Sequence, residues 1–141
     1  MGKKVALITG SSRGIGAACA TEFAQAGYNV IIHCNRNVER AKDVANACIS
    51  LGAEVLVCQA DVSKYDECEK LVQESISKFG FIDVLVNNAG IEFNGSIMDT
   101  EIEKFDQVMK TNAYGPFYMS KLIVPYMLNE KSGSIIFISS T

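Results

Sequence analysis

The segment Thr9-Gly10-Ser11-Ser12-Arg13-Gly14-Ile15-Gly16 decides how the rest of this 141-residue chain is interpreted. It follows a short apolar run, Val5–Thr9, which predicts a strand, and it opens a helical pattern at residues 14–27. A glycine-rich turn between a strand and a helix is typical of a phosphate-binding loop, and the alternative is a turn that binds nothing. No Gly-Lys-Ser/Thr follows, so the segment is not the phosphate loop of a nucleoside triphosphatase.

The spacing Gly-x3-Gly-x-Gly gives each glycine a task of its own. Gly10 allows the tight turn, and Gly14 lets the backbone approach a pyrophosphate with no Cβ in the way. Gly16 permits close packing of helix on strand, and the helix N-terminus supplies free N–H groups and a partial positive charge. The first gap is wider than in the usual Gly-x-Gly-x2-Gly fingerprint. The loop residues that we assign to a dinucleotide are Gly10, Ser12, Arg13, Gly14, Ile15 and Gly16.

Strand patterns and helix patterns alternate along the whole chain. The predicted strands are Val5–Thr9, Asn29–Cys34, Glu54–Cys58, Val84–Asn87 and Ser134–Ser139, and the predicted helices cover residues 14–27, 38–51, 63–79, 100–110 and 112–130. Several strands are apolar almost throughout, as expected where helices cover both faces of a sheet. The alternation predicts an α/β fold: a Rossmann-like doubly wound parallel sheet in three α/β/α layers. Because no repeat or linker divides the chain, we expect one domain over residues 1–141.

Single residues mark the ends of the predicted helices. Gly27, Gly52 and Gly80 each follow a helical pattern, where a left-handed residue ends a helix. Ser63, three residues before Asp66, is expected to cap the third helix. Pro125 is expected to bend or interrupt the last helix.

Composition and charge exclude several classes of protein. Apolar residues make up 48% and charged residues 21%, as in ordinary globular proteins. The net charge is −3 and the basic residues are scattered, so we expect no nucleic-acid surface, and no apolar run is long enough for a membrane span. The five cysteines form no CxxC pair and His33 is the only histidine, so neither a disulfide framework nor a metal site is expected. We interpret these six residues as buried structural residues of a cytoplasmic protein.

Four further motifs follow the glycine loop in order. They are Asp61-Val62 after the third strand, Asn87-Asn88-Ala89-Gly90 at the end of the fourth, Thr111-Asn112 at the head of the last helix, and Ser139-Ser140 at the end of the fifth strand. Together with the TGxxxGIG pattern of the loop, they make the chain resemble the short-chain dehydrogenases/reductases. Within that family the 3-oxoacyl-[acyl-carrier-protein] reductases look most similar, and the resemblance covers the whole chain.

The resemblance implies cofactor contacts for two of these motifs. Asp61 is expected to contact the adenine ring, with the backbone of Val62 nearby, and Asn88, Ala89 and Gly90 are expected to shape the cofactor pocket. Taken singly, Asp61 also fits a helix cap and Asn88 also fits a turn former.

The end of the second strand favours NADP(H) over NAD(H). NAD-binding Rossmann folds place an acidic residue there to hold the ribose 2′-hydroxyl, whereas this chain has Asn35. Arg36 follows it and Arg13 lies in the glycine loop, so two guanidinium groups are available for a 2′-phosphate. Glu39, one helical turn further on, is expected to face solvent. The alternative is that Arg13 and Arg36 are solvated surface charges.

The resemblance also implies a catalytic set, of which this chain holds a part. In the family a serine positions the substrate carbonyl oxygen and an asparagine holds a water in a proton relay; Ser140 and Asn112 match them. A tyrosine exchanges the proton, and a lysine four residues later lowers the pKa of that tyrosine, but no tyrosine of this chain has such a lysine. That pair lies beyond the serine in the family, and this chain ends at Thr141. We therefore expect an N-terminal portion, truncated after the fifth strand, which would be left as an apolar sheet edge.

The expected function is that of the parent protein. We expect an NADP(H)-dependent oxidoreductase that reduces a ketone by hydride transfer. The expected ketone is a 3-oxoacyl thioester carried on acyl carrier protein. The resemblance to the full-length family also implies a homo-oligomer. The chain as given is expected to be inactive. The alternatives are a non-catalytic dinucleotide-binding module and a fragment that completes its sheet with another polypeptide.

Overall fold

Five parallel strands form one sheet in the computed structural model, which describes residues 2–140. Their order across the sheet is β3-β2-β1-β4-β5. The strands are β1 (Val5–Ile8), β2 (Asn29–Cys34), β3 (Val55–Gln59), β4 (Val84–Asn87) and β5 (Ser134–Phe137). The helical segments are α1 (Gly14–Gln25), α2 (Val38–Ser50), α3 (Tyr65–Phe79), α4 (Ile102–Met109), the π-helical turn η1 (Lys110–Tyr114) and α5 (Gly115–Glu130). The predicted doubly wound α/β fold is confirmed.

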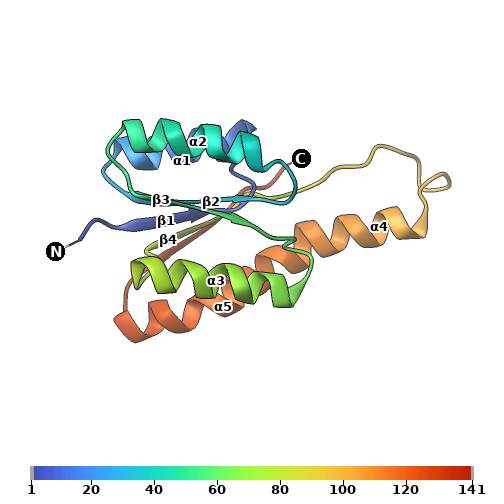
Figure 1. Ribbon diagram of the computed structural model, residues 1–141. Coiled ribbons are helices and arrows are strands. Elements are labelled where there is room, and N and C mark those ends of the chain that lie inside the picture. Colours follow the sequence, from blue (N-terminus) through green and yellow to red (C-terminus); the bar gives the residue numbers. More distant parts are fainter. Residues whose placement is uncertain (1, 141) are drawn as a thin grey trace.

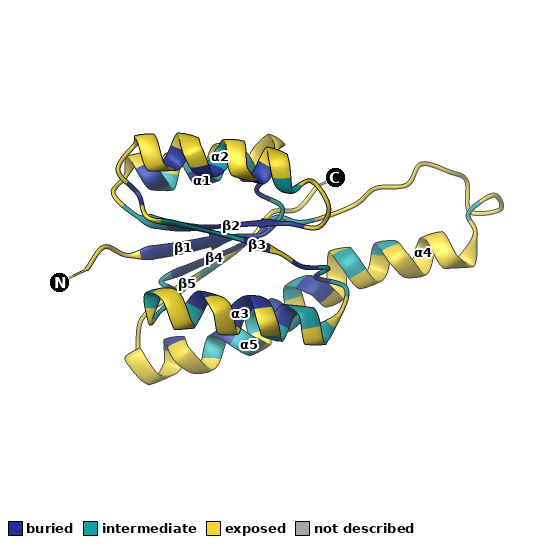
Figure 2. Cartoon of the chain, in the orientation of Figure 1, coloured by how far each residue is buried: buried dark blue, intermediate teal, exposed yellow. Residues whose placement is uncertain are grey.

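Helices cover both faces of the sheet (Figure 1): α1 and α2 lie on one face, and α3 and α5 lie on the other. This two-sided cover explains the apolar strand sequences, because every residue of β1, Val-Ala-Leu-Ile, is buried. Figure 2 shows β1 and β2 buried between helices whose outer faces are exposed, whereas the residues of β5 are mostly exposed. In contrast, α4 projects beyond the layers and has no buried residue.

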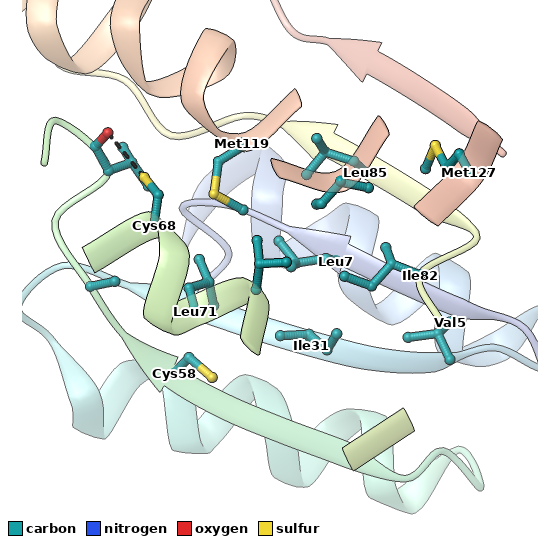
Figure 3. Packing of buried hydrophobic residues seen from close by; sticks show 14 residues of the cluster. Val5, Leu7, Ile31, Cys58, Cys68, Leu71, Ile82, Leu85, Met119 and Met127 are labelled. Carbon is teal, nitrogen blue, oxygen red and sulfur yellow. Dashed lines mark hydrogen bonds between the residues drawn. The ribbon is translucent and has the colours of Figure 1, made fainter. Parts of the chain in front are cut away.

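Successive side chains of each strand point to opposite faces and therefore supply two cores. On the α3/α5 face, Leu7 and Ile31 of the sheet pack with Leu71 of α3 and Met119 of α5 (Figure 3). Complete burial of one such side chain contributes about 1.5–3 kcal/mol. On the other face the helices present alanines, Ala20 and Ala41 among them, so α1 and α2 approach the sheet closely.

The strand order reverses between β1 and β4. Ala6 of β1 lies opposite both Val30 of β2 and Val84 of β4, so β1 is the central strand. Because all strands are parallel, the segments that follow them meet along one edge of the sheet, and ligands of such sheets bind where the order reverses. The loop after β1 therefore lies beside the segment after β4.

Two local predictions differ from the structure, and a third is tested in part. Ser63 does not cap α3: its hydroxyl donates to Asp61 Oδ1 at 2.6 Å, and the helix begins two residues later. The last helix does not begin at residue 112, because the π-helical turn η1 precedes α5. Pro125 lies inside α5 and does not interrupt it, because the helix continues to Glu130. The three glycines behave as predicted, with φ of 94° at Gly27, 97° at Gly52 and 80° at Gly80.

The prediction for the cysteines is wrong at one position. Cys34, Cys48, Cys58 and Cys68 are buried, but Cys19 is only partly buried, and all five are free thiols. Burial is the main cause that raises the pKa of both Cys58 and Cys68 to about 12. These two side chains therefore act as small apolar residues of the core. Nowhere in residues 2–140 is a helix both long enough and apolar enough to cross a bilayer.

Candidate functional site

The glycine loop between β1 and α1 adopts a conformation that requires glycine. Gly10 has φ of 62° and Gly14 has φ of 58°, values that other residues rarely adopt. An added Cβ on Gly14 would meet no atom within 4 Å, so this part of the backbone lies open to a ligand. Arg13, the N-cap residue of α1, makes no side-chain bond to the first turn. The N–H groups of that turn are therefore available to an anion.

The segment after β4 holds the loop from one side. The Asn88 side chain donates to the carbonyl oxygens of Thr9, at 3.1 Å, and Gly10, at 3.0 Å. In return, Thr9 Oγ1 accepts the N–H groups of Asn88, at 3.0 Å, and Ala89, at 2.9 Å. A Cβ on Gly10 would lie 2.8 Å from Ala89 Cα, so only glycine allows this approach. Asn88 thus fastens the loop rather than forming an isolated turn.

Strand β2 holds the loop from the other side through His33. Gly10 N–H donates to His33 Nδ1 at 2.9 Å, and His33 Nε2 lies 2.7 Å from the Ala60 carbonyl oxygen. Since Nδ1 accepts, the ring proton must be on Nε2, which donates to Ala60, and the imidazole is neutral. Burial is the largest cause that lowers the pKa of His33 below its ordinary value; the bond to Ala60 and the charge of Asp61 oppose it. The prediction that His33 is a buried residue is confirmed, but the sequence did not indicate that it contacts the loop.

A cleft of about 770 Å³ opens above the loop. Its lining includes every residue assigned to the dinucleotide except Gly16: Gly10, Ser12, Arg13, Gly14, Ile15, Asn35, Arg36, Asp61, Val62, Asn88, Ala89 and Gly90. Gly16 is buried instead, and an added Cβ there would overlap the Gly10 carbonyl group. The residues that the sequence assigned to one ligand therefore surround one space.

All three arginines of the chain line this cleft: Arg13, Arg36 and Arg40. Arg40 was not among the predicted residues, although its place one helical turn after Arg36 could have indicated it. Asn37 caps α2 by accepting the Arg40 N–H on Oδ1 at 3.0 Å, which directs the N-terminus of α2 toward the same space. Within residues 2–140, no arginine forms an ion pair with a carboxylate. Glu39 is exposed as predicted, beside Lys42 at 3.8 Å.

Asp61 lines the cleft from the end of β3, the strand next to β2. Its Oδ1 accepts the Ser63 N–H at 3.0 Å, and its own N–H donates to Glu67 Oε1 at 2.9 Å. Asp61 therefore stabilises the turn into α3 without being the N-cap, which is Lys64. Val62 is buried under the start of α5, and its packing keeps the Asp61 backbone in place.

Asn112 and Ser140 line a second hollow, of about 1210 Å³, which adjoins the first. The two spaces share Arg13, Ile15 and the segment from Asn88 to Ile91. Asn112, in η1, accepts the Ile91 N–H at 2.8 Å and donates to the Ile91 carbonyl oxygen at 2.7 Å. Ser140 is exposed beyond the end of β5. A ligand that extends from the first space into the second would thus pass beside both side chains.

Comparison with known proteins shows which family this chain is similar to. A family model described as short chain dehydrogenase matches residues 4–141. A Staphylococcus epidermidis protein named 3-oxoacyl-[acyl-carrier-protein] reductase FabG is 39% identical over 137 residues, which are 97% of this chain and 56% of that protein. Versicolorin reductase 1 of Dothistroma septosporum is 35% identical over 97% of this chain and 51% of its own length. The chain thus spans about half the length of the curated relatives it matches.

Solved structures show the same arrangement of elements. A metagenomic short-chain oxidoreductase in complex with NADP superposes with a TM-score of 0.94 at 33% identity, over 99% of this chain and 63% of that one. A putative short-chain alcohol dehydrogenase from Sinorhizobium meliloti superposes with a TM-score of 0.93 at 28% identity, over 99% of this chain and 55% of that one. The similarity in sequence and the similarity in structure therefore point to the same group of proteins.

Proposed function

The chain belongs to the short-chain dehydrogenase family, and on this premise we propose that it forms the NADP(H)-binding part of an oxidoreductase that reduces a ketone. The observation that carries the proposal is that all three arginines line the cleft above the glycine loop. Guanidinium groups bind phosphate through paired charge-assisted hydrogen bonds, whereas a carboxylate at the end of β2 would repel it. Asn35, in that place, leaves room for a 2′-phosphate.

The remaining lining residues supply the other contacts of a dinucleotide. The first turn of α1 offers its N–H groups to the pyrophosphate, and the open space at Gly14 lets a phosphate approach the backbone. Asp61 is available to the adenine end and Asn88 keeps the loop in place. The nicotinamide end would then lie in the adjoining space near Asn112 and Ser140.

A bound nicotinamide supplies or accepts the hydride. Ser140 would position the carbonyl oxygen of the substrate by a hydrogen bond, and Asn112 would support the relay that delivers the proton. No tyrosine of the chain is followed four residues later by a lysine. We propose that these residues bind the dinucleotide but do not reduce a 3-oxoacyl thioester by themselves.

The names of the relatives support the finer parts of the proposal. Curated relatives from Staphylococcus and Synechocystis are named as 3-oxoacyl-[acyl-carrier-protein] reductases, so a 3-oxoacyl thioester carried on acyl carrier protein, as in fatty acid synthesis, is the proposed substrate. The exposed apolar side chains Ile102, Phe105 and Phe117 support a homo-oligomer. Five free cysteines support a reducing cytoplasm.

Titration calorimetry with NADPH and NADH tests the proposal. We expect NADPH to bind more tightly, and Arg36→Ala to weaken NADPH by about 10- to 100-fold while it changes NADH little, because a charge-assisted hydrogen bond contributes about 1.5–3 kcal/mol. The same chain is expected to show no NADPH oxidation with a 3-oxoacyl thioester. Equal affinity for the two dinucleotides would refute the assignment of NADP(H).

A matched control separates specific contacts from net charge. Lys42 is on α2 like Arg40, is exposed, and does not line the cleft. Lys42→Ala removes one positive charge from the same helix and is expected to leave both affinities unchanged. If Lys42→Ala weakens NADPH binding as much as Arg36→Ala does, the preference for NADPH comes from the net positive charge of the region and not from contacts in the cleft.

A further inference from the structure

We propose that His33 is a positioning residue for the dinucleotide: its neutral imidazole holds the glycine loop in the binding conformation, and protonation of His33 weakens binding. The inference rests on the proposed binding of a dinucleotide to the cleft. His33 is the only histidine of the chain, lines that cleft and is 1% exposed.

Residue 33 holds two consecutive residues of the loop. Gly10 N–H donates to the ring at 2.9 Å, and Ser11 N–H donates to the His33 carbonyl oxygen at 2.9 Å. The His33 N–H donates in turn to Ser11 Oγ at 2.9 Å. The two hydrogen bonds of Ser11 involve no titrating group and do not depend on pH, but the Gly10 bond requires an unprotonated Nδ1. The turn at Gly10, where φ is 62°, therefore depends on the protonation state of one side chain.

Protonation would place two N–H groups against each other. With a proton on Nδ1, the ring could no longer accept the Gly10 N–H, and the ring or the loop would have to move. The other ring nitrogen offers no relief, because Nε2 already donates to Ala60 at 2.7 Å. Gly10 in turn holds Asn88 through its carbonyl oxygen, so a movement there would reach the opposite wall of the cleft.

The charges around the ring determine how readily it gains a proton. Asp61, after β3, favours the protonated ring, but burial outweighs this attraction and lowers the pKa of His33. Arg13 from the loop, Arg36 from the end of β2 and Arg40 from α2 line the same cleft as the imidazole. Cys58 lies opposite His33 in β3, and its thiol, like that of Cys68 in α3, stays uncharged. The ring is therefore neutral at neutral pH and becomes charged only in acid.

Two substitutions separate the hydrogen bond from the size of the side chain. Asn Oδ1 occupies the position of His Nδ1 and accepts an N–H without titrating, whereas Leu places a methyl group there. At about pH 7.5 we expect His33→Asn to bind NADPH within about threefold of wild type, and His33→Leu to bind about tenfold more weakly. The 2′-phosphate itself titrates near pH 6, and this effect is common to wild type and to His33→Asn. Any additional loss of affinity in wild type as the pH falls belongs to His33.

The decisive measurement is an NMR titration of the single imidazole, with and without NADPH, next to the binding profiles of wild type and His33→Asn. We expect the Nε2–H tautomer in the free chain, a lower pKa of His33 when NADPH is bound, and a steeper acid loss of affinity in wild type than in His33→Asn. An Nδ1–H tautomer, a pKa of His33 that NADPH raises or leaves unchanged, or identical pH profiles would overturn the inference while NADPH binding stands. Absence of NADPH binding at every pH would overturn the proposed function and this inference together. If His33→Leu does not fold, the imidazole titration of wild type still decides.

Discussion

Gly16 has a hydrogen where any other residue would place a carbon against the neighbouring loops. An added Cβ would overlap the Gly10 carbonyl group and lie 2.5 Å from the side-chain nitrogen of Asn88. Within a helix, replacing glycine by alanine ordinarily stabilises by about 0.5–1 kcal/mol. Here we expect the opposite sign: Gly16→Ala lowers the free energy of unfolding by about 1–3 kcal/mol, because Gly10 or Asn88 must move. Urea unfolding followed by circular dichroism measures the difference.

Gln25→Ala is the control for this substitution. Gln25 is on the same helix and exposed, so its replacement should change the free energy of unfolding by less than about 0.5 kcal/mol. A Gly16→Ala variant that is as stable as wild type would show that α1 does not pack on the loop as closely as described.

At single residues, the sequence predicted roles that follow from backbone chemistry better than roles that depend on a partner. Gly27, Gly52 and Gly80 have the left-handed conformation predicted for residues that end helices. His33 could not be assigned to the loop, because its bond to Gly10 joins residues 23 positions apart and depends on the direction of the ring. Ser63 was assigned to the wrong task because a carboxylate two residues earlier competes for its hydroxyl.

Asn112 helps to hold the segment between β4 and α4 at Ile91. It contains no helix or strand from residue 88 to residue 101, and Asn112 bonds both the N–H and the carbonyl oxygen of Ile91. One such bond is worth about 0.5–1.5 kcal/mol, so Asn112→Ala should speed hydrogen exchange of the Ile91 amide by about 3- to 10-fold. Asn112→Asp keeps the acceptor and loses the donor, and it should give a smaller increase. Amide exchange measured by NMR tests both.

Asn129→Ala provides the comparison for that experiment. Asn129 lies at the exposed end of α5, and among side chains of the described residues its only hydrogen bond is the one to Glu130, at 3.5 Å. Its replacement should leave the Ile91 amide unchanged. If the Ile91 amide already exchanges in wild type at the rate of a free peptide, the Asn112 contact does not persist in solution.

At the scale of elements, type was predicted more reliably than boundaries. Apolar periodicity identified the strands and the main helices, but not the π-helical turn η1 that connects α4 to α5. A π-helical turn costs intrinsic stability and is kept where tertiary contacts favour it. Its contact, Asn112 with Ile91, joins residues 21 positions apart and leaves no periodic signal. Pro125 is tolerated inside α5 for a similar reason, since the packing of Ile123 and Met127 holds that part of the helix on the sheet.

For the whole molecule, the alternation of strands and helices was enough to predict a doubly wound parallel sheet, because right-handed crossovers leave few arrangements. The shape of the site was not accessible in this way. Arg40 lines the same cleft as Arg13 and Arg36 because of the way in which α2 begins at Asn37. The second hollow adjoins this cleft because of the path that the chain takes after β4. Such facts concern distances between elements, which local patterns do not encode.

The stability of the whole molecule should depend on pH through His33. An exposed histidine in the unfolded chain gains a proton near pH 6.5, whereas burial lowers the pKa of His33 in the folded chain. Below about pH 6.5 the unfolded state therefore binds more protons than the folded state. As the pH is lowered, the free energy of unfolding decreases by at most about 1.4 kcal/mol per pH unit, until the ring in the folded chain is protonated too. Urea unfolding between about pH 7.5 and about pH 5 measures this slope. His33→Asn lacks the titrating group, so its stability should depend less on pH over this range. If wild type and His33→Asn lose stability equally as the pH falls, the imidazole gains its proton as readily in the folded chain as in the unfolded chain.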